Sequence, residues 1–78
     1  MSIREVIARN LRRLRHARKL SQEELAHRAD VDRTYISSLE RCVYGPSIDV
    51  VERLARELGM EAADLLRQSA PSRRRLRT

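Results

Sequence analysis

Two signals for the start of a helix, Ser21 and Asp32, stand eleven residues apart in the stretch LSQEELAHRADVDRTYISSLER, residues 20–41. Ser21 opens the sequence Ser-Gln-Glu-Glu, in which the serine hydroxyl can accept from the Glu24 amide while Glu24 bonds back to the serine amide. Asp32 is a residue type that is common at the cap position before a helix. One short helix must therefore end near Asp30, a residue that tolerates the left-handed conformation, and another must begin about three residues later.

Two short helices joined by a three-residue turn have to cross at a large angle, and they can approach only where their side chains are small. Ala26 and Ala29 supply small residues at the predicted crossing, and Ile36 and Leu39 fill the space beneath it. This pattern predicts a helix-turn-helix arrangement. Neither helix is long enough to persist alone, so the rest of the chain has to act as a scaffold.

Apolar residues at helical spacing predict three more helices, over residues 3–18, 48–58 and 61–67. Ser47 is a candidate cap for the second of these, and Gly59 is placed to end it. The sequence therefore predicts an all-α, five-helix domain over residues 1–68. Residues 69–78 contain four arginines and a proline without an apolar stripe, so we expect them to form a disordered basic tail. The expected inward-facing residues of the first helix are Ile3, Val6, Ile7, Leu11 and Leu14.

The net charge of +6 arises from 17 basic and 11 acidic residues, and all the basic residues except Lys19 are arginines. Arginine binds phosphate and guanine through two hydrogen bonds, which fits nucleic-acid contact, although a GC-rich genome also enriches arginine. One cysteine, Cys42, and two histidines give no metal-ligand spacing. We expect no metal, cofactor, small-molecule ligand or enzymatic activity. Since no apolar run approaches the length of a membrane span, we expect a cytoplasmic location.

The outward face of the third helix carries polar side chains that are short or bidentate: Arg33, Thr34, Ser37, Ser38 and Arg41. Arg33 can donate two bonds to guanine, and Thr34 can offer a hydroxyl or a methyl group to a base edge. Amides at the start of the second helix, near Ser21 and Gln22, are placed to bind a phosphate. The alternative is that this surface is an ordinary solvated helix face.

The stretches LRRLRHARKLSQEELAHRADVDRTYISSLE and PSIDVVERLARELGMEAADLL resemble the helix-turn-helix family of phage lambda and Cro-type repressors, often called the XRE family. The resemblance implies a lambda-repressor-like fold and an ion pair between Arg15 and Glu40. It also implies a phosphate contact from Gln22. Tyr35 and Arg41 are further candidates for phosphate contacts. Asp30 and Cys42 occupy positions where the family commonly has glycine, and Cys42 puts the path out of the third helix in question. The implied base-contacting residues are Arg33, Thr34, Ser37 and Ser38.

One such subunit reads only a few base pairs, so we expect a homodimer that binds double-stranded DNA at a two-fold symmetric operator and regulates transcription. Met60, Leu65 and Leu66 are the candidate dimer surface, and the alternative is that both leucines complete the core of the monomer. Three roles compete: the controller of a restriction–modification cassette, a phage-type repressor and an antitoxin. A fourth hypothesis is a protein-interaction module that keeps the fold but antagonises another regulator.

Overall fold

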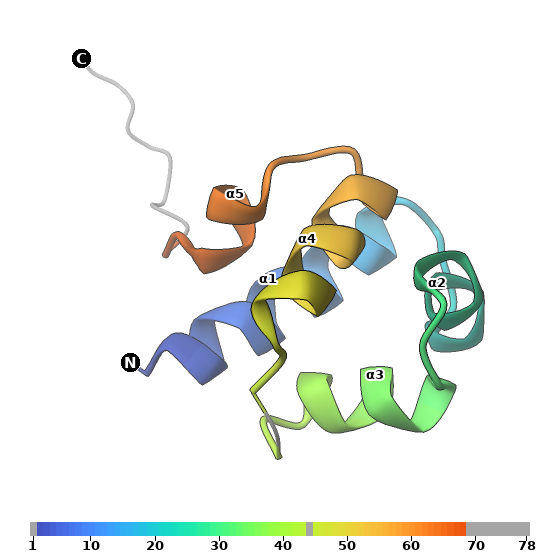
Figure 1. Cartoon of the computed structure of the whole chain (residues 1–78), viewed down its shortest axis with the longest axis horizontal. Coiled ribbons are helices and arrows are strands. Elements are labelled where there is room, and N and C mark those ends of the chain that lie inside the picture. The colour runs from blue at the N-terminus through green and yellow to red at the C-terminus, as the bar shows by residue number, and fades with distance from the viewer. Residues whose placement is uncertain (1, 44, 69–78) are drawn as a thin grey trace.

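The computed structural model describes residues 2–43 and 45–68, and these ranges form five helices with no strand among them (Figure 1). The all-α, five-helix prediction is therefore confirmed. The predicted disordered tail, residues 69–78, lies outside the described residues. None of the helices in the described ranges has the length and apolar character needed to cross a membrane. The helices are α1 (Ile3–Ala17), α2 (Gln22–Ala29), α3 (Arg33–Glu40), α4 (Ile48–Glu57) and α5 (Ala62–Leu66).

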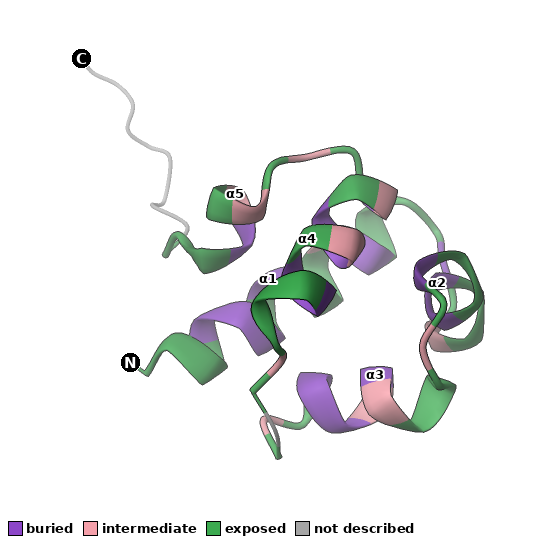
Figure 2. Cartoon of the chain, in the orientation of Figure 1, coloured by how far each residue is buried: buried purple, intermediate pink, exposed green. Residues whose placement is uncertain are grey.

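Each helix contributes at least one side chain with no exposed surface to a single core. These residues are Leu11, Leu25, Ile36, Leu54 and Leu65, one from each helix in chain order. Burying a side chain of this size stabilises a fold by about 1.5–3 kcal/mol. Because five short helices share one core, none of them is positioned independently of the others. Figure 2 shows buried residues, in purple, along α1, α3 and α4.

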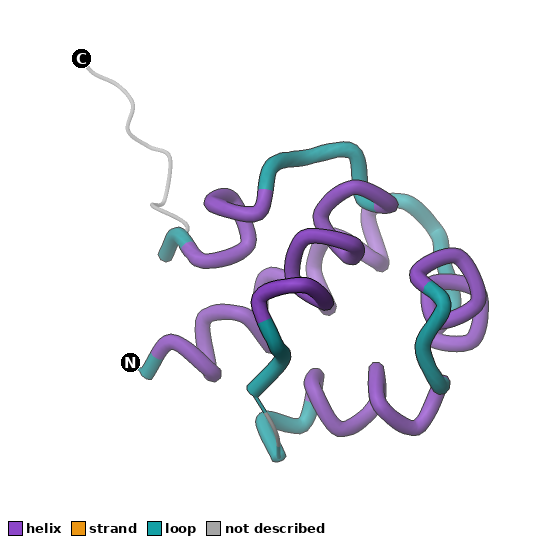
Figure 3. The backbone as a smooth tube through the Cα atoms, in the orientation of Figure 1, coloured by secondary structure: helices purple, strands orange, loops and turns teal. Residues whose placement is uncertain are grey.

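The predicted crossing of α2 and α3 is confirmed by the burial of its small residues. Ala26 and Ala29 are each only 2% exposed, and Ile36 and Leu39 lie in the same core cluster. A short loop joins the two helices, which run in very different directions (Figure 3). The small side chains let the helices approach closely, as the helix-turn-helix arrangement requires.

Four of the helices end with a residue in the left-handed conformation, and only one of these residues is glycine. The φ angles are 57° at Lys19, 59° at Asp30, 63° at Cys42 and 73° at Gly59. After α3, the Cys42 amide donates to the Leu39 carbonyl at 3.1 Å and the Val43 amide donates to the Ser38 carbonyl at 2.9 Å. These are the two bonds of a Schellman motif. Cys42 therefore adopts the conformation that a glycine would take, and the path out of α3 is that of a regular helix end.

The caps of α2 and α4 are those that the sequence predicted, but the predicted cap of α3 does not form. Ser21 and Glu24 form the predicted capping box, and the Ser47 hydroxyl accepts from the Val50 amide. Asp32 stands at the cap position of α3, but its side chain makes no capping hydrogen bond. The Tyr35 amide donates instead to the Asp32 carbonyl at 3.0 Å, so the backbone satisfies the group that a cap would have bound.

The start of α1 and the last helix differ most from the sequence-based expectations. Ile3, expected inside, is 54% exposed because it lies in the first turn of α1, beyond the core. Leu65 is fully buried, so its prediction as a dimer-surface residue is wrong and it completes the core of the monomer. Met60 is half-buried against the core, while Leu66 is 41% exposed.

Asn10 holds α5 against α1 through hydrogen bonds that the sequence analysis did not anticipate. Its side chain is 1% exposed, and Nδ2 donates to the carbonyls of Leu65 and Arg67, both at 2.9 Å. A five-residue helix has little stability of its own, and these bonds satisfy carbonyls at its end. The signal was present as a polar residue within the apolar stripe of α1.

Candidate nucleic-acid interface

The start of α3 presents its polar side chains to the outside of the molecule. Arg33 and Thr34 are exposed, and Ser37 is half-buried one turn further along the same helix. Figure 2 shows the helix changing from exposed at its start to buried at its end. A helix held in this way can offer its first turns to a groove of DNA while its last turn stays attached to the protein.

Ser38, predicted as a base-contacting residue on this outward face, is only 5% exposed, and that prediction is wrong. It lies three residues after half-buried Tyr35, so its side chain falls on the flank of the inward stripe. The chain also turns back at Cys42, where the Val43 amide binds the Ser38 carbonyl. The outward polar face of α3 is therefore narrower than the sequence indicated.

The last turn of α3 is attached to α1 by an ion pair between Arg15 and Glu40. Arg15 Nε donates to Glu40 Oε2 at 2.6 Å, and Arg15 Nη2 donates to Glu40 Oε1 at 2.9 Å. The two side chains are 9% and 1% exposed. The Arg15 guanidinium also donates to the Leu20 carbonyl at 2.8 Å, in the segment that joins α1 to α2. The contact implied by the family resemblance is present, and its bidentate geometry fixes the orientation of α3 relative to α1.

The charged form of this pair is favoured over the neutral form. Burial alone raises the pKa of Glu40, but the hydrogen bonds from Arg15 and Gln22, with the charges of Arg15 and Arg12, outweigh it and lower the pKa. The hydrogen bond from Glu40 raises the pKa of Arg15, although burial opposes this. Both groups are therefore ionised across the neutral range.

Gln22, the predicted phosphate contact, lies at the start of α2 beside this ion pair. Its Nε2 donates to Glu40 Oε1 at 3.2 Å, so one carboxylate joins α1, α2 and α3. The neighbouring Ser21 amide donates to Glu24 Oε1 at 3.0 Å, and the Ser21 hydroxyl accepts from the Glu24 amide. The backbone bond to Ser21 lowers the pKa of Glu24. The Ser21 amide is thus engaged by Glu24. The Ser21 hydroxyl acts there only as an acceptor, so it can still donate its proton to a phosphate.

The other two candidates for phosphate contacts are Tyr35, within α3, and Arg41, directly after its last residue. Tyr35 is half-buried and packs against the core. Arg41 is exposed, and its Nε donates to the Ser37 carbonyl at 3.4 Å, which directs the guanidinium along the outside of the helix. The structure thus places Arg33, Thr34, Ser37 and Arg41 along α3, with Gln22 and Ser21 at the adjoining end of α2.

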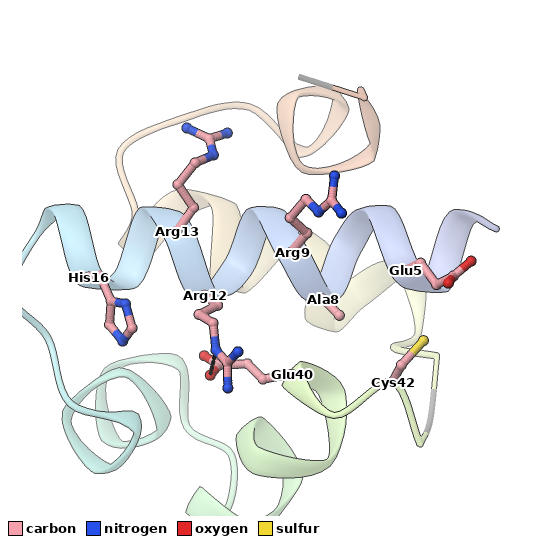
Figure 4. A pocket seen from close by; sticks show the side chains of 8 residues that line it. All are labelled: Glu5, Ala8, Arg9, Arg12, Arg13, His16, Glu40 and Cys42. Carbon is pink, nitrogen blue, oxygen red and sulfur yellow. Dashed lines mark ion pairs between the residues drawn. The ribbon is translucent and has the colours of Figure 1, made fainter. Parts of the chain in front are cut away.

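A groove of about 410 Å³ separates α1 from the end of α3 (Figure 4). Four basic residues of α1 line it, and Glu40 lies beneath one of them. The sequence analysis assigned no function to these basic residues. They are Arg9, Arg12, Arg13 and His16. Among residues 2–43 and 45–68, no three histidine, cysteine or acidic side chains come together in a way that could hold a metal ion.

Proteins similar to this chain include several that are named as regulators. Residues 6–69 match the family described as a helix-turn-helix domain. A hypothetical transcription factor of Neisseria meningitidis serogroup B is 41% identical over 64 residues, which are 82% of this chain and 60% of that protein. The chain thus spans less than two thirds of this relative. Control protein C.BamHI of Bacillus amyloliquefaciens is 38% identical over 83% of this chain and 82% of its own length.

Solved structures that resemble this fold also include a transcription factor and controller proteins. The crystal structure of the Neisseria factor superposes with a TM-score of 0.83, at 39% identity, over 86% of this chain and 77% of that one. The restriction–modification controller protein C.AhdI of Aeromonas hydrophila has a TM-score of 0.76 and 35% identity, with 80% and 94% of the two chains covered. C.Esp1396I bound to a 25 base pair operator site has a TM-score of 0.74 and 25% identity, over 83% and 86%.

The family match and the fold shared with these proteins define the class as helix-turn-helix transcriptional regulators. The chain belongs to the helix-turn-helix family of lambda and Cro-type regulators, which includes the restriction–modification controller proteins.

Proposed function

We propose that this protein is a sequence-specific transcriptional regulator that binds a two-fold symmetric operator as a homodimer, with α3 in the major groove. The observation that carries this proposal is the exposed start of α3, where Arg33 and Thr34 project from a helix whose other end is fixed by Glu40. A rigidly held helix with a bidentate donor in its first turn suits the reading of base edges.

In this arrangement, the residues divide into base contacts and backbone contacts. Arg33 donates two bonds to a guanine, Thr34 meets the neighbouring base, and Ser37 reaches the groove at its half-exposed edge. Gln22 and Arg41 bind phosphates on either side, together with the Ser21 hydroxyl. Half-buried Tyr35 can add a phosphate contact only through its hydroxyl. Backbone contacts of this kind set the position of the recognition helix on the duplex.

Two subunits are needed for a site of useful length. The operator in the C.Esp1396I structure has 25 base pairs, which is more than two helical turns of DNA. One recognition helix reads only a few base pairs, so two copies of this chain would bind half-sites about 10 bp apart or a multiple of that spacing.

The surface that we assign to the dimer is an apolar hollow between α1, α4 and α5. Ile48 is 87% exposed and Ile3 is 54% exposed at its rim, and Leu66 lies beside them. Exposed apolar patches of this kind are typical of interaction surfaces. The occupant is a second copy, because a two-fold operator requires a self-complementary interface. Leu66 and the two isoleucines thus replace buried Leu65 as the proposed contacts, and Met60 lies outside the hollow.

Selection from a random duplex library tests the DNA-binding proposal. The expected result is an enriched sequence with two-fold symmetry, bound with an affinity that falls steeply as salt rises. Enrichment of no sequence, with no retention of duplex at low salt, would show that the protein acts only as a protein-interaction module.

Sedimentation of Ile48→Asp tests the dimer. The substitution places a charge in the apolar hollow at a position that contributes little to the core, so a dimer should dissociate while the helical content is retained. Val43→Asp, at a 52% exposed position outside the hollow, is the matched control. Equal masses for Ile48→Asp and the unmodified protein would show that the interface lies elsewhere.

Among the possible roles, we favour an autoregulating controller of a restriction–modification cassette in the cytoplasm, because C.AhdI is described as a restriction–modification controller protein and C.BamHI as a control protein. A methyltransferase gene beside the coding sequence would support this role. A toxin gene or a phage integrase gene in that place would favour an antitoxin or a phage repressor instead.

A further inference from the structure

The groove between α1 and the end of α3 carries a positive charge that no partner among residues 2–43 and 45–68 neutralises completely. Arg15 neutralises Glu40 through two short hydrogen bonds. Arg12 also approaches Glu40, but its Nε stays 3.9 Å from Oε1, beyond hydrogen-bond distance, and its side chain is 62% exposed. One carboxylate thus faces two guanidinium groups, and the charge of Arg12 is left in excess.

We propose that Arg12 is a DNA-backbone contact, so that the DNA footprint extends from the helix-turn-helix onto α1. The inference rests on the proposed function, and nothing in the family resemblance assigns this role to Arg12. In the free protein the Arg12 guanidinium lies close to the Glu40 carboxylate. On DNA this guanidinium turns outward to bind a phosphate. Arg12 can do so without breaking a short internal hydrogen bond, and a guanidinium is more weakly hydrated than an ammonium group.

Arg12 lies beside Gln22, and this position determines where its proposed phosphate contact would fall. Arg12 Nε and Gln22 Nε2 both lie within 4 Å of the same atom, Glu40 Oε1, at 3.9 and 3.2 Å. The two donors come from different helices, α1 and α2, and converge on one buried carboxylate. A strand of DNA whose phosphate reaches Gln22 therefore passes directly over Arg12.

The direction of the side chain distinguishes Arg12 from the neighbouring arginines. Figure 4 shows Arg12 and His16 pointing from α1 toward α2 and α3, while Arg9 and Arg13 point to the side of α1 that carries α5. Arg9 therefore carries the same charge on the same helix and lines the same groove, but its side chain points away from α2 and α3. This makes Arg9 the matched control for a contact that depends on direction.

The test compares Arg12→Gln, Arg9→Gln and the unmodified protein for binding to the selected operator and to a scrambled duplex, by fluorescence anisotropy over a range of salt concentrations. Loss of one phosphate contact should reduce the slope of log affinity against log salt by about 1 for Arg12→Gln and weaken both duplexes by the same factor. Arg9→Gln should keep the slope of the unmodified protein, and Arg12→Lys should restore it.

An unchanged slope for Arg12→Gln, or an equal reduction for Arg9→Gln, would overturn the inference while leaving the proposed function intact. Failure of the unmodified protein to bind any duplex would overturn both. Circular dichroism of each variant confirms that the fold is retained, and a loss of helix in Arg12→Gln would assign the residue to structure instead of DNA contact.

Discussion

Arg15 and Glu40 are 25 residues apart in the sequence, yet the Arg15 guanidinium holds the Glu40 carboxylate with two hydrogen bonds of 2.6 and 2.9 Å. This pair joins the scaffold helix α1 to the end of the recognition helix α3. Because Gln22 of α2 binds the same carboxylate, the relative orientation of three helices depends on one buried group. A buried ion pair of this kind fixes the orientation of the helices that it joins, but it is weak evidence for a gain in the free energy of folding.

Removing one partner of the pair should cost more than replacing both. Glu40→Ala leaves the Arg15 guanidinium buried without its counter-ion, and we expect a loss of about 3–5 kcal/mol in the free energy of unfolding. The double variant Arg15→Met/Glu40→Leu should lose clearly less than the sum of the single losses, as measured by urea denaturation. Glu52→Ala, at an exposed position on α4, is the control. Additive losses would show that the two groups do not interact.

The stabilising effect of the Arg15–Glu40 pair should also depend on pH. The folded state lowers the pKa of Glu40 below its ordinary value of 4.5, so its contribution to stability is complete above that pH and is lost as the pH falls through the lower, folded value. The difference in melting temperature between the unmodified protein and Glu40→Gln should therefore shrink below pH 4.5. A difference that stays constant into the acid range would contradict the assigned shift.

Arg33→Ala should cost about 1–3 kcal/mol of binding free energy on the selected operator and relax specificity at one base pair. The reason is that Arg33 is the exposed bidentate donor in the first turn of α3. Affinity measurements on a set of operators with single base changes provide the test, with Arg53→Ala on α4 as the control. If every sequence lost affinity equally, Arg33 would be a phosphate contact.

Cys42→Gly should stabilise the protein by up to about 1 kcal/mol. Cys42 has a φ of 63°, a conformation that costs a residue with a side chain about 1–2 kcal/mol, and glycine adopts it freely at the expense of a more flexible unfolded chain. Thermal unfolding of Cys42→Gly and Cys42→Ala separates the effect of conformation from loss of the thiol. Identical melting temperatures for the two variants would show that position 42 is not strained.

Ala26→Leu should destabilise the protein by about 1–3 kcal/mol, because Ala26 is 2% exposed where α2 crosses α3 and has no room for a larger side chain. The measurement is chemical denaturation, with Ala63→Leu on the exposed side of α5 as the control. An unchanged midpoint for Ala26→Leu would mean that the crossing lies at a different residue.

The sequence predicted the helices and their crossing because those features depend on local signals. Capping residues, small residues at the turn and apolar spacing act within a few positions of one another. The Arg15–Glu40 pair was anticipated only through the family resemblance, since no local rule links residues 25 positions apart. Asn10 was missed for the same reason, as its hydrogen-bond acceptors lie at the far end of the chain.

The residues on the flanks of helices were the ones that the sequence could not assign. Helical spacing gives the angle of Ser38 or Leu65 around its own helix, but not whether a neighbouring segment covers that angle. By itself, the sequence predicted a five-helix domain with a helix-turn-helix whose third helix begins with an exposed arginine. Only the tertiary structure decided that Ser38 and Leu65 are buried and that Arg12 lies beside Gln22, because burial and convergence depend on how separate helices pack together.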